Sequence, residues 1–290
     1  MSGRNPRILI IGAALALSGV APGAAAAPPK SAPGKPPAAK AGASAPKSKL
    51  DLPGLQKSLE SGDEAQVLQA LDTIQKSGDP AGAAPVEALL ARGASAKVLL
   101  RAIETLRSLG QASSGGALVP YTRHRAPELR RSALRALIAT KSPLAGDVLR
   151  LALHGDDPVQ RSIAARGLGD LDVRAAVPEL FSALPKDVAE AAQSLGMLCT
   201  GAECEKLLGL LGKLRFDVME SAVVPLLLRP QVEVSDELKL KLIEHLRRMA
   251  TQPAHQLLQT ALAKLPPDGS PQVKRGLERA LKGFSATEEQ

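Results

Sequence analysis

The chain has 290 residues, of which 1% are aromatic and none is Trp, and its formal net charge is +8. Such a charge indicates a nucleic-acid partner only when it forms a basic stripe on the folded domain. Seven of the 37 Lys and Arg residues and none of the 29 Asp and Glu residues lie in residues 1–49, so residues 50–290 carry 30 basic and 29 acidic residues. The excess positive charge therefore belongs to the N-terminal segment, and we expect no nucleic-acid binding.

Residues 1–27 have the three parts of a secretory signal peptide. Arg4 and Arg7 form a short basic start, residues 8–20 are apolar, and a run of small residues covers 23–27. The apolar run is short for a membrane span. We predict an exported bacterial protein, periplasmic or extracellular, whose leader is cleaved near Ala25–Ala27 and which then has no integral membrane span. A leader retained as an anchor is the alternative.

Residues 28–49 are rich in Pro, Ala and Lys, a composition that cannot form a core and predicts a disordered linker. Two interpretations stay open. The segment is either a semi-extended spacer or a tether whose lysines contact an anionic envelope polymer. Those lysines are Lys30, Lys35, Lys40, Lys47 and Lys49.

A helical repeat begins at Leu50, where residues 50–61 predict an opening helix. Beyond it an apolar doublet recurs at steps of 32, 31, 30, 28 and 31 residues, with a further apolar residue about one turn later. A two-helix unit cannot bury its own apolar face, so a period of this size indicates stacked helix pairs. No alternating polar and apolar run indicates a sheet. The doublets are Ala70-Leu71, Ala102-Ile103, Ala133-Leu134, Ile163-Ala164, Ala191-Ala192 and Ala222-Val223.

One complete unit lies in residues 157–186. Asp157 is the predicted N-cap of its first helix and Pro158 the first helical residue. Gly169-Asp170 is predicted to end that helix in a left-handed turn. The second helix places Val177, Leu180, Phe181 and Leu184 on one face.

The C-terminal units are less regular. We predict that the doublet column continues in Leu242-Ile243 and in Leu277 with Leu281, at steps of 20 and 35 residues, with a partner helix around Leu257 and Ala261. Irregular end units are typical of the capping end of a repeat array. The repeat region is predicted to cover residues 50–284, and residues 285–290 a frayed tail.

The unit at 157–186 resembles the bacterial HEAT repeat, especially the short phycobiliprotein-lyase HEAT-like type of the armadillo-like superfamily. This resemblance implies an all-α, right-handed α-solenoid of about seven stacked helix pairs, whose second helices line a concave surface. The residues that carry it are Asp157, Pro158, Val159, Arg161, Ala164, Ala165, Leu168, Gly169, Ala176, Val177, Pro178, Glu179, Leu180, Ala183 and Leu184.

Arginines give the strongest local charge pattern, in the run Arg123-His124-Arg125 followed by Arg130, Arg131 and Arg135. The run is either a patch that binds an acidic partner or a solvated ridge paired with neighbouring acids. Because aromatic residues are scarce, affinity for a partner would rest on Arg contacts and summed area. The candidate partner-binding residues are Arg101, Arg123, Arg125, Arg131, Arg135, Gln160, Arg161 and Arg166.

The two cysteines, Cys199 and Cys204, lie between two predicted helices. An exported chain favours a disulfide between them, and two buried thiols are the alternative. HEAT-like hydroxylases hold iron with paired His-Glu dipeptides, and this sequence has none. We therefore expect no metal, no cofactor and no catalytic residues.

These patterns together predict an exported, non-catalytic HEAT-repeat scaffold that binds a protein partner along its concave helical surface. Two alternatives remain. The first is an accessory factor resembling the phycobiliprotein-lyase type of HEAT protein. The second is an envelope-polymer binder that acts through the Lys-rich linker.

Overall fold

The computed structural model describes residues 50–288, so the predicted signal peptide (1–27), the predicted linker (28–49) and residues 289–290 lie outside the described residues. Contacts join the described residues in one compact unit.

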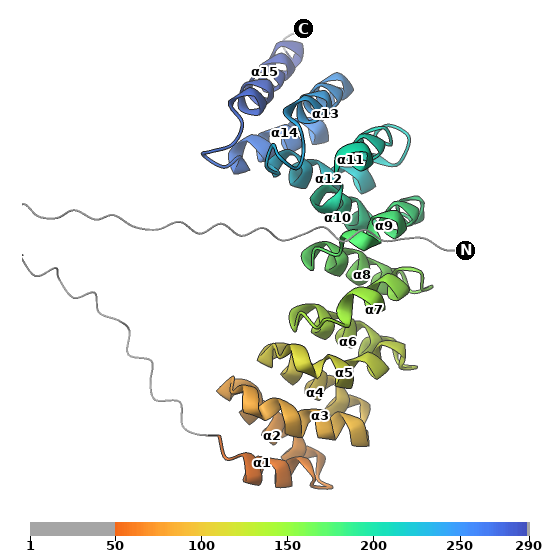
Figure 1. The fold of residues 1–290 in the computed structure, drawn as a ribbon, viewed down its shortest axis with the longest axis vertical. Helices are drawn as coiled ribbons and strands as arrows, with labels where there is room; N and C mark the ends of the chain where they lie inside the picture. Colours follow the sequence, from red (N-terminus) through yellow and green to blue (C-terminus); the bar gives the residue numbers. More distant parts are fainter. Residues whose placement is uncertain (1–49, 289–290) are drawn as a thin grey trace, which may run out of the picture. The chain divides into compact units, whose positions relative to one another are not determined.

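Helices and turns make up the whole of the described range, which contains fifteen α-helices and no strand (Figure 1). The even-numbered helices are α2 (Glu64–Ser77), α4 (Ala96–Leu109), α6 (Pro127–Ala139), α8 (Pro158–Asp170), α10 (Ala189–Leu198), α12 (Phe216–Leu228) and α14 (Gln252–Lys264). The odd-numbered helices are α1 (Leu52–Leu59), α3 (Ala83–Arg92), α5 (Gly115–Leu118), α7 (Ala145–Leu153), α9 (Val177–Ala183), α11 (Gly201–Leu208), α13 (Asp236–Met249) and α15 (Pro271–Glu288). Short 3-10 segments cover Pro80–Gly82, Ala112–Ser114, Val119–Arg123, Arg174–Ala176 and Leu184–Lys186.

The helices form two layers. Each even-numbered helix from α2 to α12 packs against the next even-numbered helix, whereas contacts between successive odd-numbered helices are sparser from α3 to α11. Between residues 50 and 288, α1 is thus followed by seven helix pairs, α2–α3 to α14–α15, stacked in chain order. This arrangement confirms the predicted α-solenoid of about seven helix pairs. The last helix runs to Glu288, beyond the predicted end of the repeat region at residue 284.

The even-numbered helices lie on the inner side of the curve of this unit in Figure 1, and we call them the inner layer. Counted from Asp157, α8 is the first helix of its pair. The inner layer therefore consists of first helices, not of the second helices that the family resemblance implied. The reason lies in side-chain size: the recurring small residues of these helices let neighbours approach closely, and the more closely packed layer takes the inside of a bend.

The repeated doublets fill the space between the two layers. Five of the six predicted doublets are buried as expected. The fourth is wrong by one residue, because Ile163 is only half-buried whereas Ala164 and Ala165 are fully buried. Helix α8 is therefore rotated about its own axis, so that Ile163 lies at the inner surface and Ala164 and Ala165 face the core.

The predicted continuation of the column beyond Ala222 is wrong. Helices α13 and α15, which contain Leu242-Ile243 and Leu277, pack against each other in the odd-numbered layer, and α14 packs against α12. Ala254 of α14 is fully buried and lies 32 residues after Ala222. The repeat therefore stays regular through α14, and the bulkier apolar residues of α13 made the outer helix resemble the inner one.

The predicted start of α8 is confirmed, and its predicted end is wrong. The Asp157 carboxylate accepts hydrogen bonds from the backbone N–H groups of Val159 (2.9 Å) and Gln160 (3.4 Å). Gly169 lies inside the helix, and the left-handed residue is Asp172. Gly169 is required instead by packing, since a Cβ there would collide with the side chain of Ser194 on α10.

Among the helices of residues 50–288, none combines the length and the apolar composition that a bilayer crossing requires.

Candidate functional site

Two grooves open on the inner layer. The first, the arginine groove, has a volume of about 490 Å³ and crosses α4, α6, α8 and α10. It is lined by Arg107, Arg135, Ile138, Ala139, Val159, Ser162, Ile163, Arg166, Asp170 and Glu190. The second, the C-terminal groove, has a volume of about 560 Å³ and crosses α10, α12 and α14. It is lined by Gln193, Glu220, Ser221, Val224, Pro225, Leu228, Pro253, Gln256, Leu257, Thr260 and Lys264.

Arg135 and Arg166 occupy equivalent places on α6 and α8. Each follows directly after a buried pair, Ala133-Leu134 in one helix and Ala164-Ala165 in the next. Both side chains are exposed, and neither forms a hydrogen bond or ion pair with any described residue. The pair therefore presents two positive charges, on neighbouring helices of the inner layer, that have no direct ion-pair partner among the described residues.

The third arginine of the groove is compensated. Arg107 donates from Nε to Glu104 in the same helix (2.8 Å), and this hydrogen bond raises the pKa of the guanidinium. Two carboxylates, Asp170 and Glu190, line the same groove without a partner among the described residues. The groove thus has a cationic middle on α6 and α8 and an acidic edge where α8 meets α10.

Three of the predicted partner-binding arginines are already engaged in contacts of the fold. Arg101 Nε donates to Asp72 Oδ1 (2.6 Å), which links α4 to α2. Arg131 binds Asp157 through Nε and Nη2 (3.0 and 3.1 Å). Arg161 donates to the carbonyl oxygens of residues 155 and 156 (3.0 and 2.9 Å). Binding a partner with these side chains would require breaking a contact of the fold.

The remaining predicted arginines do not join one site. Arg123 and Arg125 are exposed in the turn before α6 and line neither inner groove, whereas Arg135 and Arg166 line the same groove. Gln160 is buried and donates to Asp157 Oδ2 (3.2 Å). Sequence reasoning missed Asp170 and Glu190. Their signal is the helical spacing: Asp170 lies one turn after Arg166 on α8, and Glu190 directly precedes the buried doublet Ala191-Ala192 of α10.

Asp157 combines two roles, as N-cap of α8 and as partner of Arg131 on α6. Its side chain is 11% exposed. The hydrogen bond from Arg131 lowers the pKa of the Asp157 carboxyl to about 2, and the donors at residues 159 and 160 add to this effect. The carboxylate is therefore ionised over the whole physiological range and fixes α8 against α6.

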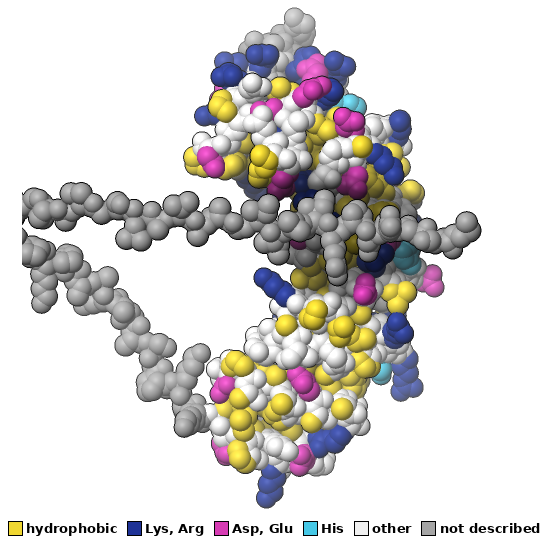
Figure 2. Space-filling model, viewed as in Figure 1, with side chains coloured by type: hydrophobic (Ala, Val, Ile, Leu, Met, Phe, Trp, Pro, Cys, Tyr) yellow, Lys and Arg dark blue, Asp and Glu magenta, His cyan; other side chains and the backbone are white. Residues whose placement is uncertain are grey.

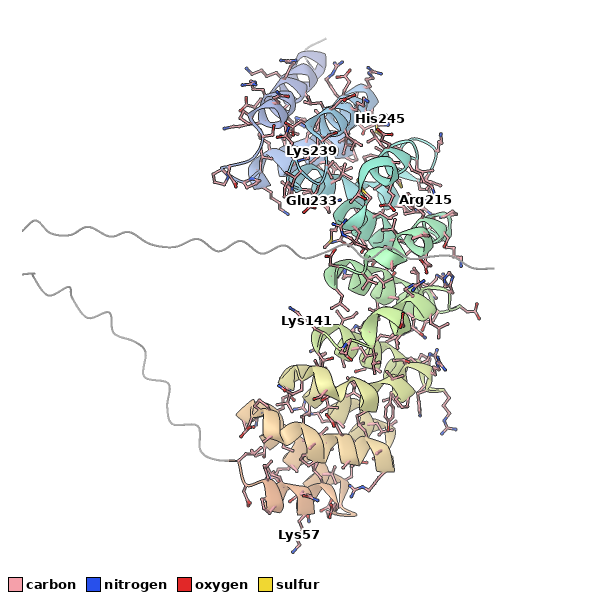
Figure 3. The ribbon with its side chains drawn as sticks, in the orientation of Figure 1. Lys57, Lys141, Arg215, Glu233, Lys239 and His245 are labelled. Atoms are coloured by element: carbon pink, nitrogen blue, oxygen red, sulfur yellow. A yellow bond between two sulfur atoms is a disulfide. The ribbon has the colours of Figure 1, made fainter. Side chains whose placement is uncertain are left out.

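Cys199 and Cys204 are joined as a disulfide between α10 and α11, with their Cα atoms 5.2 Å apart. Beside it, Arg229 Nη1 donates to the Cys199 carbonyl oxygen, and Lys239 Nζ donates to the carbonyl oxygen of Arg229. Burial lowers the pKa of Lys239. Figure 3 marks Lys239 and Glu233, the Arg229 partner (2.8 Å), between the helices of the C-terminal half. These buried contacts make this region a structural joint.

Other polar clusters offer less to a ligand. A third groove of about 750 Å³, between α11 and α13, carries both signs of charge in mutual pairs, such as Glu237 with Lys241 (2.8 Å) and Glu244 with Arg248 (2.9 Å). Within residues 50–288 no group of three or more His, Cys, Asp or Glu side chains is placed to hold a metal ion. The face shown in Figure 2 carries interspersed basic and acidic side chains rather than a field of one sign.

No protein-family model matches the chain, and no curated protein matches its sequence. Solved structures do match in fold. A chain of the phycocyanin lyase complex of CpcE and CpcF from Nostoc sp. PCC7120 is 16% identical, with a TM-score of 0.45 over 86% of this chain and 100% of the other. A chain in a homology model of the full-length AP-3 complex is 14% identical, with a TM-score of 0.51 over 79% of this chain and 50% of the other. YibA of E. coli is 17% identical, with a TM-score of 0.43 over 81% and 93%.

At these identities the likeness concerns the fold alone. Designed armadillo repeat proteins are among the matching structures as well. In this chain the fold is built from helix pairs of about 31 residues, stacked in chain order, with small buried residues between the layers. By its architecture, the described part of the chain is a HEAT- and armadillo-like helical repeat protein.

Proposed function

We propose that this solenoid is a scaffold that holds a protein partner, or a segment of one, along its inner layer. One observation carries the proposal: the arginine groove and the C-terminal groove both open on the even-numbered helices and meet at α10. Stacked repeats present one exposed position per helix as a continuous surface. A partner lying across both grooves would contact α4 to α14.

The composition of the two grooves supports an extended binding mode. Neither groove contains an aromatic residue, and each combines half-exposed apolar side chains with polar ones. Without deep aromatic anchors, affinity has to come from many modest contacts and from arginine pairs. Among the predicted partner-binding residues, Arg135 and Arg166 are the two that both line a groove and are free to make such pairs.

Export is part of the proposal. The basic start, apolar stretch and small-residue run in residues 1–27 support secretion, and a disulfide between Cys199 and Cys204 suits an oxidising compartment. The Pro, Ala and Lys composition of residues 28–49 supports a spacer between the export signal and the solenoid.

Site-specific photocrosslinking tests the proposal. A benzophenone side chain is placed at Ala139 in the arginine groove or at Thr260 in the C-terminal groove, and at Asp147 on α7 of the outer layer as the matched control. After irradiation in the cell envelope, the inner positions should give a discrete crosslinked protein, and Asp147 should not. Crosslinks from Asp147 alone would reject the inner layer as the binding surface.

A further inference from the structure

One position of the inner helices changes its charge along the stack. The position is the residue that follows the buried doublet, taking Ala164-Ala165 as the doublet of α8 and buried Ala254 with half-buried His255 as its counterpart in α14. From α2 to α14 it is occupied by Asp72, Glu104, Arg135, Arg166, Gln193, Val224 and Gln256. Because equivalent positions of successive helices lie side by side on the inner surface, this column is acidic at the N-terminal end, basic on α6 and α8, and uncharged afterwards.

The acidic members of the column are already neutralised. Asp72 accepts from Arg101 (2.6 Å), and Glu104 accepts from Arg107 (2.8 Å). Arg135 and Arg166 have no such partner among the described residues. The two adjacent positive charges are thus the part of the column that is left for an external carboxylate, and arginine binds carboxylates with two parallel hydrogen bonds.

An apolar floor lies beside these charges. Val159 is 39% exposed, and Ile138 and Ile163 are half-buried in the wall of the same groove. Residues of this kind cost free energy when they face water, so the groove favours an occupant with apolar side chains as well. A free inorganic anion would leave this floor uncovered.

The spacing of the helices suits an extended chain. Packed helices lie about 8–10 Å apart, and an extended chain rises about 3.3 Å per residue. Two carboxylates that are two residues apart lie on the same face of an extended segment, about 6.6 Å apart along the backbone. The long arginine side chains on adjacent helices can span the remaining distance. On the α10 side of the groove, Asp170 and Glu190 would repel further carboxylates of a bound segment. An acidic segment in this groove would therefore have to end before it reaches α10.

We infer that the arginine groove binds a short acidic segment of the partner protein in extended form, with its carboxylates on Arg135 and Arg166 and its apolar side chains on the floor of the groove. The inference rests on the proposed function and adds the chemistry of the partner.

The test uses fluorescein-labelled octapeptides and the chain without its leader. One peptide alternates Glu and Val, and two matched peptides replace Glu by Gln or by Lys. The Glu/Val peptide should bind, and the double variant R135E/R166E should weaken its binding about tenfold or more. The matched variant R123E/R125E, which has the same change in net charge outside the groove, should stay within about twofold. The variant D170N/E190Q should tighten binding about two- to fivefold by removing like charge.

The inference fails if the Gln/Val peptide binds as tightly as the Glu/Val peptide, or if R123E/R125E weakens binding as much as R135E/R166E. It fails as well if the Glu/Val peptide does not bind at about 1 mM. The conservative variant R135Q/R166Q, with circular dichroism spectra of all variants, separates loss of binding from loss of fold. Crosslinking from Ala139 and Thr260 without peptide binding would retain the proposed function and reject only the acidic partner.

Discussion

Two contacts between neighbouring inner helices, which we call joints, use different atoms to hold the helices together. The first joins α6 to α8, and the second joins α10 to α12. In the first, a Cβ at Gly167 would meet the side chain of Ile138, and Arg131 of α6 forms an ion pair with Asp157 at the start of α8. In the second, a Cβ at Gly196 would lie 2.5 Å from the backbone carbonyl oxygen of Ala222. Side chains can rotate away and a packed backbone cannot, so equal repeats do not imply equal tolerance to substitution.

Replacing glycine by alanine in each joint should give the largest difference between the two losses in the free energy of unfolding. Gly196→Ala forces two helix backbones apart and should lower the free energy of unfolding by about 3 kcal/mol. Gly167→Ala should lower it by only about 1 kcal/mol, because half-buried Ile138 can move and Ala favours the helix, although fully buried Leu149 also lies 3.0 Å from the added Cβ. Urea unfolding followed by circular dichroism measures both. Equal losses would show that the backbone contact does not distinguish the joints.

Replacing the arginine of each joint by methionine should give the next largest difference between the two losses in the free energy of unfolding. Arg229 is 8% exposed and holds the Cys199 carbonyl oxygen. Arg229→Met leaves that buried acceptor unsatisfied and should cost about 2–3 kcal/mol.

The matched change Arg131→Met removes a side chain that is 32% exposed. It should cost about 1 kcal/mol in the same urea experiment, because water can replace much of the contact. A larger loss for Arg131→Met than for Arg229→Met would contradict the contrast between a buried and a half-exposed joint.

Acid should weaken the first joint through Asp157. Its folded-state pKa is about 2 and its unfolded value is about 4, so the unfolded state takes up the proton first. The resulting stabilisation, about 1–2 kcal/mol, is complete above pH 4 or so and is lost as the pH falls towards 2.

Asp157→Asn should therefore lower stability at pH 7 and make almost no difference at pH 2. Paired urea titrations at these two values measure the effect. A difference between wild type and variant that does not shrink on acidification would show that the carboxylate charge is not what joins the two helices.

The smallest effect is expected for a pair that joins no repeats. Arg247 and Arg248 lower the pKa of Glu244 to about 2, but all three residues lie in α13, and the pairs are exposed to solvent. Glu244→Gln should leave the urea midpoint unchanged at about 150 mM salt, where exposed pairs are screened. A loss as large as that of Asp157→Asn would mean that α13 needs this charge for its own stability.

The features of the fold that could be predicted from the sequence are those that depend on residues close together in the chain. The buried doublets of α2, α4, α6, α10 and α12 and the N-cap at Asp157 depend on residues within one or two helical turns, and the period is the recurrence of these local patterns along the chain. The register of α8 was wrong by one residue because Ile163 is as apolar as a core residue, and only the neighbouring helices show which face is covered. Gly169 looked like a helix end for a similar reason: the need for glycine there comes from Ser194, a repeat away.

The candidate site shows the same division. The sequence by itself determined that helix pairs of about 31 residues would stack, because a short amphipathic pair cannot bury its apolar face alone. Tertiary structure alone decided which layer takes the inner side and which arginines remain free. Arg101, Arg131 and Arg161 find partners that only the stacking or the preceding turn places within reach, whereas Arg135 and Arg166 face a groove that no single helix contains. A charge becomes available for binding only when the fold leaves it without a partner, and that is a property of neighbouring repeats rather than of any one segment.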